Sequence, residues 1–251
     1  MTNPFKAALA EGRVQLGIWS SLCNPLAAEI LAQSAFDWVL FDAEHSPVEI
    51  AGLLPLLQAA GNGGAAPIVR PPWNDLVLIK RALDIGARTL LLPFVQNEAE
   101  AEAAAAAMRY PPRGRRGVAG STRAGRYGRD AGYLRCADAE VCTLVQVETR
   151  EAMARVEAIA AVDGIDGVFI GPADLSASYG LLGQPGAEVV QADIRAAAGK
   201  IRAAGKAPGI MASSVDDVRR YLDWGYLFVA CGVDVRLLVH GVDALHAELR
   251  G

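Results

Sequence analysis

The amino-acid sequence predicts an α/β fold, a closed (β/α)8 TIM barrel, and three observations point to it. Short apolar runs alternate about eight times with longer, Ala-rich stretches of helical periodicity. The runs lack in-out alternation, which is typical of parallel strands covered on both faces. The length of 251 residues fits one barrel domain over residues 1–251. A doubly wound open sheet is the alternative, although no G-x-G-x-x-G follows the first strand.

The expected strands are short and apolar: Gln15–Ser20, Trp38–Phe41, Ala66–Arg70, Thr89–Leu92, Thr143–Val147, Gly167–Ile170, Ala207–Ile210 and Leu227–Cys231. The expected helices lie between and after them: Pro25–Ala35, Pro47–Ala60, Asp75–Ile85, Asn97–Met108, Arg150–Ala160, Gln191–Ala204, Ser214–Trp224 and Val235–Leu249. A strand followed by a helix, repeated eight times, is the pattern of a closed parallel barrel.

Capping residues mark several of the expected helix starts. Asn24-Pro25, Ser46-Pro47 and Asn74-Asp75 each place a capping side chain or a proline at a first turn. Two segments exceed a plain barrel, namely the Arg- and Gly-rich Arg109–Asp138 and the Gly-rich Gly180–Glu188. Loops as long as the first of these usually serve function or assembly in compact domains.

Charge and cysteine content narrow the class of protein. The formal net charge of -4 argues against nucleic acid or an anionic membrane as the main partner. The four cysteines show no C-x-x-C spacing, so we expect no disulfide framework or zinc site. Cys142 directly precedes one expected strand and Cys231 ends another, and both are expected to be small buried hydrophobes. Because the start shows no signal pattern and no apolar run could span a membrane, we expect a soluble cytoplasmic protein.

Polar residues cluster where the expected strands end, and in a barrel these positions face the catalytic mouth. Glu148 follows the fifth strand and Asp174 the sixth, so both carboxylates can point into one mouth. Two carboxylates without a nearby Cys or clustered His suit a hard cation such as Mg²⁺ or Mn²⁺. The alternative is that each acid only caps the helix that follows it.

His45 is the acid–base candidate, because it is the only histidine near the end of an expected strand. Imidazole titrates near neutral pH, as a general acid or base requires. Asp42, at the end of the same strand, would orient His45 or a bound water. The alternatives are a surface or capping role for His45 and simple amide capping for Asp42.

Arg70 ends the third strand, and a charge at the end of a buried strand needs a partner. Its planar guanidinium suits a carboxylate or a developing enolate oxygen. The alternative is a structural ion pair with Asp42 or Asp84. The turn Gly171-Pro172-Ala173-Asp174 opens a helix, so its backbone N–H groups are candidates for binding a substrate carboxylate.

The lysines argue against a Schiff base. The chain has only four, Lys6, Lys80, Lys200 and Lys206, and none stands at the carboxyl end of an expected strand. A covalent imine mechanism therefore has no candidate nucleophile. A carbonyl enzyme with this sequence is expected to polarise its substrate with a metal.

Several segments in order resemble one known family. They are Gly17-Ile18-Trp19, Phe41-Asp42-Ala43-Glu44-His45-Ser46-Pro47, Val69-Arg70-Pro71-Pro72, Tyr110-Pro111-Pro112-Arg113-Gly114-Arg115-Arg116-Gly117, Gln146-Val147-Glu148-Thr149 and Ile170-Gly171-Pro172-Ala173-Asp174-Leu175-Ser176. Together they resemble the HpcH/HpaI aldolase family, the metal-dependent 2-oxo acid aldolases of the phosphoenolpyruvate/pyruvate barrel superfamily. The resemblance spans nearly the whole chain.

The resemblance implies roles for the polar residues of the mouth. Glu148 and Asp174 would hold a divalent ion, Mg²⁺, Mn²⁺ or Co²⁺. Arg70 would contact the oxo acid and stabilise its enolate. His45 would act as acid or base, with Asp42 nearby.

The resemblance also extends the expected site. Asp84, in the third expected helix, would orient His45. The family is typically hexameric, so the Arg109–Asp138 segment would contact other subunits and Arg123 would reach a neighbouring active site. The residues expected to bind substrate are Trp19, Arg70, Gln146, Gly171, Pro172, Ala173, Asp174, Met211 and Arg123.

The reaction that follows is reversible aldol cleavage of a 4-hydroxy-2-oxo acid to an aldehyde and pyruvate, or a substituted pyruvate such as hydroxypyruvate. Such chemistry fits the breakdown of aromatic compounds. The nearest rival is an acyl-CoA lyase of the malyl or citramalyl type, although no site for its long nucleotide is apparent. A non-catalytic barrel that only binds an oxo acid is a further alternative.

Overall fold

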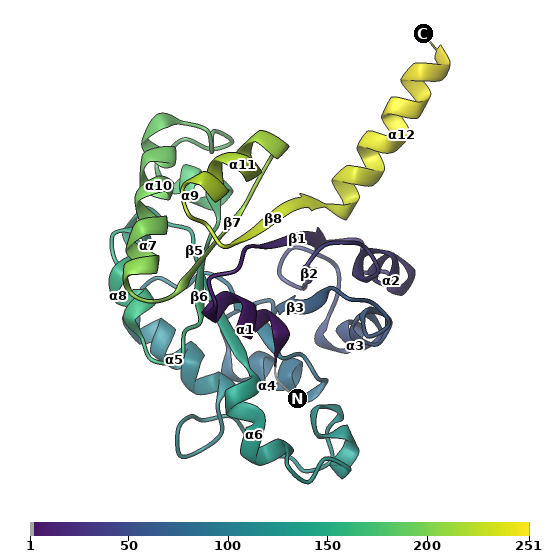
Figure 1. Ribbon diagram of the computed structural model, residues 1–251, viewed down its shortest axis with the longest axis vertical. Helices are drawn as coiled ribbons and strands as arrows, with labels where there is room; N and C mark the ends of the chain where they lie inside the picture. Colours follow the sequence, from purple (N-terminus) through teal and green to yellow (C-terminus); the bar gives the residue numbers. More distant parts are fainter. Residues whose placement is uncertain (1–2, 251) are drawn as a thin grey trace.

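The strands close into a barrel. The structure, a computed structural model, describes residues 3–250, where eight parallel strands pair in chain order and the last returns to the first (Figure 1). Their bounds are β1 (Gln15–Ser20), β2 (Trp38–Asp42), β3 (Ala66–Arg70), β4 (Thr89–Leu92), β5 (Cys142–Val147), β6 (Gly167–Ile170), β7 (Ala207–Met211) and β8 (Phe228–Val233). The predicted TIM barrel is therefore confirmed, and the open sheet is wrong.

Strand bounds agree closely with prediction. β1, β3, β4 and β6 have the predicted bounds, while β2, β5 and β7 are each one residue longer. β8 begins one residue later than predicted and continues to Val233. The apolar runs located the strands well because both faces of each strand are covered, as their burial shows.

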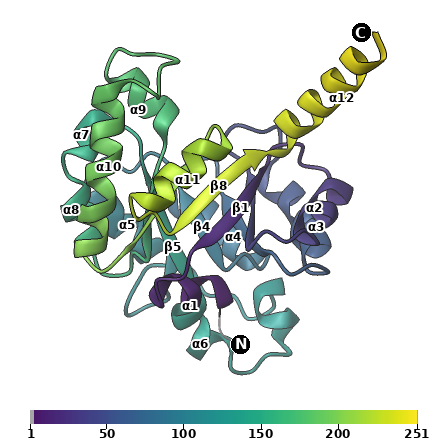
Figure 2. The same cartoon turned by 45° about the horizontal axis from the view of Figure 1, so that its top comes forward.

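The helices surround the barrel and add pieces beyond the predicted eight (Figures 1 and 2). Their bounds are α1 (Pro4–Ala10), α2 (Pro25–Ala32), α3 (Ile50–Ala60), α4 (Leu76–Asp84), α5 (Glu98–Met108), η1 (Arg123–Gly128), α6 (Tyr133–Glu140), α7 (Arg150–Met153), α8 (Val156–Ala161), α9 (Pro172–Ser178), α10 (Glu188–Ala203), α11 (Val215–Asp223) and α12 (Asp234–Arg250). The Arg109–Asp138 segment thus contains η1 and much of α6.

The start of α3 corrects a prediction. The helix begins at Ile50 rather than Pro47, and its N-cap residue Glu49 makes no side-chain capping bond. The residues before it form a turn instead, because the Asp42 carboxylate accepts hydrogen bonds from the Glu44 and His45 amides at 3.0 and 3.4 Å. The polar turn of the mouth therefore displaces the first helical turn.

Two further helix starts, and the interior of one predicted helix, can be compared with prediction. The Asn24 side chain caps α2 as predicted, whereas α4 is capped by Asp75, one residue after Asn74. The predicted helix Arg150–Ala160 is broken into α7 and α8 at Arg155, whose φ of -107° and ψ of 7° are not helical.

Aromatic and large apolar side chains fill the interior of the barrel. At its amino end, α1 closes the opening with Phe5, whose ring lies edge-on to Phe228 and Trp38 at 6.0 and 6.4 Å between centroids. Two glycines make room for these rings. A Cβ atom on Gly17 would lie 2.0 Å from the Trp38 ring, and one on Gly209 would lie 2.2 Å from Phe228.

The cysteines are free, as expected. Cys142 is buried, but Cys231 is only half-buried, because β8 is less covered near its end. No helix in residues 3–250 is long and apolar enough to cross a membrane.

The last helix stands apart from the others. α12 extends away from the barrel at the end of β8, carrying the C-terminus far from the other helices (Figures 1 and 2). Its base is fixed by buried Asp234, which accepts hydrogen bonds from Ser20 Oγ at 2.9 Å and the Ser21 amide at 2.8 Å.

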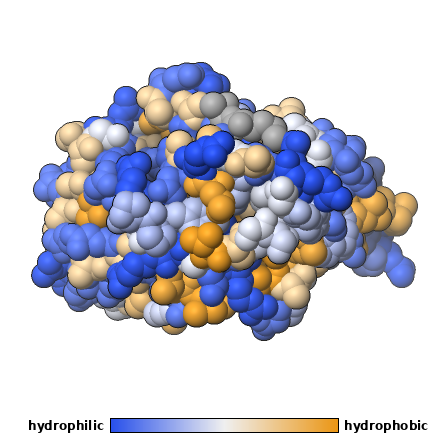
Figure 3. Space-filling view, turned by 90° about the horizontal axis from the view of Figure 1, so that it is seen from below, coloured by the Kyte–Doolittle hydropathy of each residue, from blue (hydrophilic) through white to orange (hydrophobic). Residues whose placement is uncertain are grey.

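The face of the molecule seen from below is mostly hydrophilic, with a hydrophobic strip near its centre (Figure 3).

Candidate active site

Arg70 and Asp42 form the buried centre of the barrel mouth. Arg70 Nε and Nη2 donate to the two Asp42 oxygens at 2.8 and 2.7 Å, a bidentate pair between β3 and β2. Trp19 Nε1 also donates to Asp42 at 3.2 Å, and the guanidinium carbon lies 4.7 Å from the centre of the Trp19 ring. Burial raises the pKa of Asp42, but its bonds from Arg70 and Trp19 outweigh burial, so the pKa is lowered.

The Arg70–Asp42 contact bears on the alternative that Arg70 only forms a structural ion pair. Arg70 does form the ion pair with Asp42 that a structural role would require, yet this leaves Nη1 directed elsewhere. Nη1 lies 2.8 Å from Glu44 Oε2 and 3.4 Å from Gln146 Oε1. The carboxylate of Asp42 therefore fixes the plane of the guanidinium, and one edge of that plane faces the other residues of the mouth.

Glu44 is a residue of the site that sequence reasoning missed. Its contact with Arg70 has the distance of an ion pair, but Glu44 Oε2 makes no directed hydrogen bond. Burial, opposed by the charge of Arg70, leaves its pKa raised. Its place in the Asp42-Ala43-Glu44-His45 segment was the available signal, but whether the side chain turns inward depends on the local backbone.

Glu148 follows β5 and is also buried. It accepts hydrogen bonds from the Phe94 amide at 3.0 Å and from Gln146 Nε2 at 2.5 Å. Burial, with the charges of Glu44 and Asp174, raises its pKa to about 7, against the lowering effect of the Gln146 bond. The positive charge of Arg70 lowers the pKa of Glu148 but does not offset burial and the neighbouring carboxylates.

The turn after β6 leaves space for Glu148. A Cβ atom on Gly171 would lie 2.7 Å from Glu148 Oε2. Pro172 and Ala173 begin the short helix α9, and Asp174 lies in its first turn, exposed to solvent. The negative charge of Asp174 contributes to the raised pKa of both Glu44 and Glu148.

These residues suit a divalent cation in charge and chemistry. Asp42, Glu44, Glu148 and Asp174 are all oxygen donors, and Arg70 is the main cation acting on Glu44 and Glu148. Across residues 3–250, no group of three or more His, Cys, Asp or Glu side chains is arranged to hold a metal ion. A cation held by only two protein carboxylates, such as Glu148 and Asp174, would keep its other positions for water or substrate.

His45 lies at the rim of the mouth rather than inside it. Its side chain is 67% exposed, and Nε2 lies 3.9 Å from Glu44 Oε1. The backbone is held by Asp42, as described above. The exposure leaves His45 accessible to a substrate that enters the mouth.

Two predicted residues have other partners within the chain. Asp84, at the end of α4, binds Nη2 of the buried Arg116 at 2.9 Å. Arg123, in η1, donates to the Ile85 carbonyl at 2.8 Å. In the described part of this chain Asp84 forms an ion pair with Arg116, while His45 Nε2 lies near Glu44.

The remaining predicted positions lie at strand ends. Met211 ends β7 half-buried, packed against the interior cluster of the barrel. Gln146, near the end of β5, joins Arg70 to Glu148 through its two side-chain ends. Trp19 supports Arg70 from below, as its ring contact shows.

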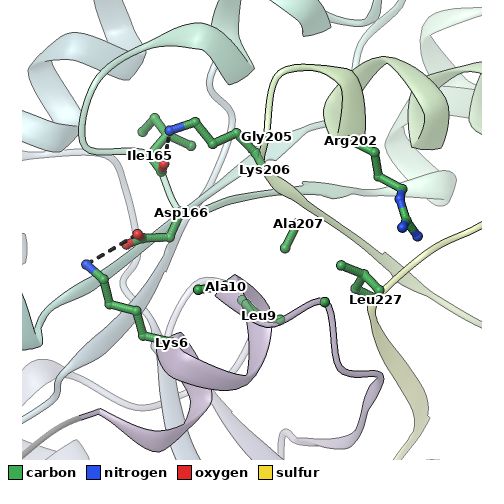
Figure 4. A pocket seen from close by; sticks show the side chains of 11 residues that line it. Lys6, Leu9, Ala10, Ile165, Asp166, Arg202, Gly205, Lys206, Ala207 and Leu227 are labelled. Carbon is green, nitrogen blue, oxygen red and sulfur yellow. Dashed lines mark hydrogen bonds and ion pairs between the residues drawn. The ribbon is translucent and has the colours of Figure 1, made fainter.

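The amino end of the barrel has a hollow of a different kind (Figure 4). It has a volume of about 260 Å³. Lys6 Nζ bonds to the Val141 carbonyl at 2.7 Å and to Asp166 at 3.2 Å, and Lys206 Nζ bonds to the Ile165 carbonyl at 2.8 Å. Lys6 lies in α1 and Lys206 directly precedes β7, so both lysines lie at the amino end of the barrel. Lys80 and Lys200 lie on α4 and α10, so none of the four lysines stands at the carboxyl end of a strand.

Comparison with known proteins places the chain in a family. The family model described as HpcH/HpaI aldolase/citrate lyase matches residues 15–241. The chain belongs to the HpcH/HpaI aldolase/citrate lyase family. The resemblance of its motifs to this family is therefore confirmed.

Curated relatives of this family are similar over nearly their whole length. The chain is 54% identical over 246 residues to a pyruvate aldolase of Rhizobium etli, covering 98% of this chain and 97% of the relative. It is 53% identical over 249 residues to a 4-hydroxy-2-oxo-heptane-1,7-dioate aldolase of Salmonella dublin, covering 99% and 95%. These similarities make the chain an aldolase, as predicted.

A solved structure of the family has the same fold. A HpcH/HpaI aldolase/citrate lyase family protein from Burkholderia cenocepacia superimposes with a TM-score of 0.97 at 36% identity, and the match covers 100% of both chains. The closed barrel described above is thus the fold of this family member as well.

Proposed function

We propose that this aldolase is metal-dependent and reversibly cleaves 4-hydroxy-2-oxo acids to pyruvate, or a substituted pyruvate such as hydroxypyruvate, and an aldehyde. One observation carries the proposal: Arg70, fixed by Asp42, directs Nη1 toward Gln146 beside the buried, poorly compensated carboxylate of Glu148. A guanidinium suits the oxygens of an oxo acid and its enolate. A carboxylate of this kind suits a cation.

Glu148 and Asp174 would hold the cation, of the Mg²⁺, Mn²⁺ or Co²⁺ class. When bound, it would polarise the 2-oxo group and offset negative charge that develops there. Glu148 accepts hydrogen bonds from the Phe94 amide and the Gln146 side chain, and these orient its carboxylate. Such support fixes a ligand in place before the ion arrives.

The protein side chains divide the reaction between them. Arg70 and Gln146 would hold the oxo acid through its carboxylate and 2-oxo oxygens. A base at the rim, which we assign to His45, would take the proton from the 4-hydroxyl group as the C3–C4 bond breaks. The bond electrons move to C3 and the 2-oxo oxygen, which gives the pyruvate enolate and releases the aldehyde.

Arg70 would then stabilise the enolate oxygen, because its guanidinium is held rigidly and is buried. A proton delivered to C3 completes pyruvate. In the reverse direction the same groups remove a C3 proton and guide the enolate onto an aldehyde. Microscopic reversibility therefore gives His45 the opposite role at the aldehyde oxygen.

The test is a direct assay of pyruvate. Metal-free protein is mixed with a racemic 4-hydroxy-2-oxo acid, with and without Mn²⁺, and pyruvate release is followed. We expect release that depends on Mn²⁺ and stops with a chelator. Equal release with a chelator contradicts the metal proposal. Release of acetyl-CoA from malyl-CoA or citramalyl-CoA, with no pyruvate released from the 4-hydroxy-2-oxo acid, identifies an acyl-CoA lyase instead.

We also propose that the chain forms a homo-oligomer, with a second copy covering α12. Apolar residues on α12 recur at intervals of three and four and are 37 to 77% exposed: Val235, Leu238, Val242, Leu245 and Leu249. This spacing gives one continuous apolar face on a helix, and so large an uncovered face indicates an interaction surface. A hexamer is the form that the family resemblance implies, and the four free cysteines suit a reducing cytoplasm.

Light scattering after size-exclusion chromatography tests the assembly. Leu238→Glu with Leu245→Glu is expected to reduce the molar mass to that of a smaller species. Arg236→Glu with His240→Glu, on another face of the same helix, is the matched control. Equal masses for wild type and the leucine variant at micromolar concentration exclude α12 as the contact.

A further inference from the structure

We propose that Trp73 and Phe94 form an aromatic platform at the rim, which binds the aldehyde part of the substrate and favours aldehydes with a planar apolar group. This inference rests on the proposed aldol reaction and names the substrate class that it takes. The aromatic platform follows two neighbouring strands, β3 and β4. It is a determinant of specificity rather than part of the bond-breaking machinery.

The two rings stack in the open. Their centroids are 5.6 Å apart and their planes meet at 29°. Trp73 is 52% exposed and Phe94 is 39% exposed. Two large aromatic side chains that stack on each other and still face solvent present flat apolar surface to any molecule at the mouth.

Phe94 connects the platform to the proposed metal ligand. Its backbone amide donates to Glu148 Oε1 at 3.0 Å. The same residue therefore contacts the proposed metal ligand through its backbone and carries one ring of the platform. Its φ of +55° lies in the left-handed region. A bulky residue rarely adopts this conformation, and it persists only where the surrounding structure imposes it. Left-handed backbone at Phe94 is compatible with both contacts, the amide on Glu148 and the ring on Trp73.

Trp73 lies close in sequence to Arg70, the cation of the site. It follows Arg70 by three residues, and Pro71 and Pro72 between them restrict the backbone. Its carbonyl accepts from the Asp75 amide at 2.9 Å. The next side chain, Asn74, donates to the Glu100 carbonyl at 3.3 Å. The backbone that carries the indole is therefore tied to α5 through Asn74, and the indole itself stacks on Phe94.

The chemistry of the substrate determines what the platform meets. The oxo acid end is charged and belongs beside Arg70 and Glu148, so the substituent beyond C4 must point away from them toward the rim. On the β3–β4 side the rim offers two aromatic faces. Aromatic faces stack on planar apolar groups in an offset arrangement, so this side favours an aryl or vinyl aldehyde over a small hydroxylated one.

The experiment compares two aldehydes on one protein. In the presence of Mn²⁺, kcat/KM for addition of pyruvate is measured with benzaldehyde and with glycolaldehyde. We expect Trp73→Ala and Phe94→Ala each to lower the benzaldehyde to glycolaldehyde ratio at least tenfold. Trp73→Phe should keep the ratio within threefold, since it keeps a ring. Val14→Ala, an exposed apolar residue ahead of β1, is the control.

The ratio separates specificity from loss of folding, because inactive protein lowers both rates equally. An unchanged ratio in Trp73→Ala and Phe94→Ala overturns the inference. A wild-type enzyme that rejects benzaldehyde overturns it as well, as does an unchanged ratio accompanied by a smaller molar mass, which would make the rings a contact between copies.

Failure of the underlying reaction is recognised separately. Wild-type protein with Mn²⁺ should exchange the C3 protons of pyruvate with deuterium from solvent, which needs no aldehyde. Absence of exchange contradicts the proposed function itself. Exchange with an unchanged aldehyde ratio contradicts only the aromatic platform.

Discussion

The two ends of the barrel satisfy their charged residues differently. At the amino end, Lys6 and Lys206 donate to backbone carbonyls, and Asp166 accepts from Lys6. At the carboxyl end, Glu44 and Asp174 add to burial in raising the pKa of Glu148. The amino end is therefore complete within one chain, whereas the carboxyl end concentrates negative charge.

This difference separates stability from chemistry. Excess like charge in a buried site costs folding free energy and is retained where a ligand relieves it. A plug of aromatic rings such as that around Phe5 has no such cost, because its parts pack on one another. Changes at the mouth should therefore reduce activity first, and changes at the base should reduce stability first.

The largest effect should come from Glu148. Glu148→Gln keeps the shape and the side-chain size but removes the charge that we assign to cation binding. We expect kcat/KM for pyruvate release to fall by more than about 1,000-fold, on the order of 4 kcal/mol in transition-state stabilisation. Mn²⁺ binding measured by calorimetry should weaken in parallel, and circular dichroism should show the same helix content. Full activity in this variant would remove Glu148 from the site.

At the opposite end, Phe5→Ala should break the plug without touching the chemistry. Phe5 is 1% exposed and meets two rings, so its truncation leaves a cavity and should lower the free energy of unfolding by about 3–5 kcal/mol. Denaturant unfolding measures this loss. Activity per folded molecule should stay within twofold, and a selective loss of kcat at full stability would contradict the separation of the two ends.

Much of the mouth could be predicted because it depends on strand ends. Runs covered on both faces locate parallel strands, and the residue after each strand must face the same rim. Arg70, Gln146 and Glu148 followed directly from that rule. Their mutual contacts, such as the Gln146 bond to Glu148, are what the structure adds.

Other parts depended on backbone conformation that the residue types do not determine. Glu44 turns inward because Asp42 holds the following turn, and this also moved the start of α3 to Ile50. Phe94 enters the site through its amide and a left-handed φ, although its side chain is apolar. Asp84 was expected to orient His45, and that role stays a prediction. Its bond from Arg116, a buried arginine of the long Arg109–Asp138 segment, could not be read from the sequence.

The titration of Glu148 gives a smaller effect that belongs to the mouth alone. Its folded pKa of about 7 lies above the ordinary value of 4.5, so the folded state holds this proton more tightly than the unfolded state. The resulting stability is complete below about pH 4.5 and is lost as the pH rises through about 7, by on the order of 3 kcal/mol at most.

Melting of metal-free protein between pH 4.5 and 8 tests this. Wild type should lose stability relative to Glu148→Gln as the pH rises, and Mn²⁺ should restore wild type more than the variant. If the two melting curves keep a constant separation over this range, then Glu148 does not titrate there.

The smallest effect should come from the ion pair at the base. Lys6→Met keeps an unbranched apolar stem but removes the ammonium that binds Val141 O and Asp166. Because the two side chains are 29% and 22% exposed, water screens the pair, and we expect a loss of only about 1 kcal/mol in the free energy of unfolding. Asp166 keeps its hydrogen bond from the Thr143 amide at 2.8 Å, so it is not left without a partner. A loss as large as that of Phe5→Ala would mean that charge, rather than aromatic packing, holds the amino end closed.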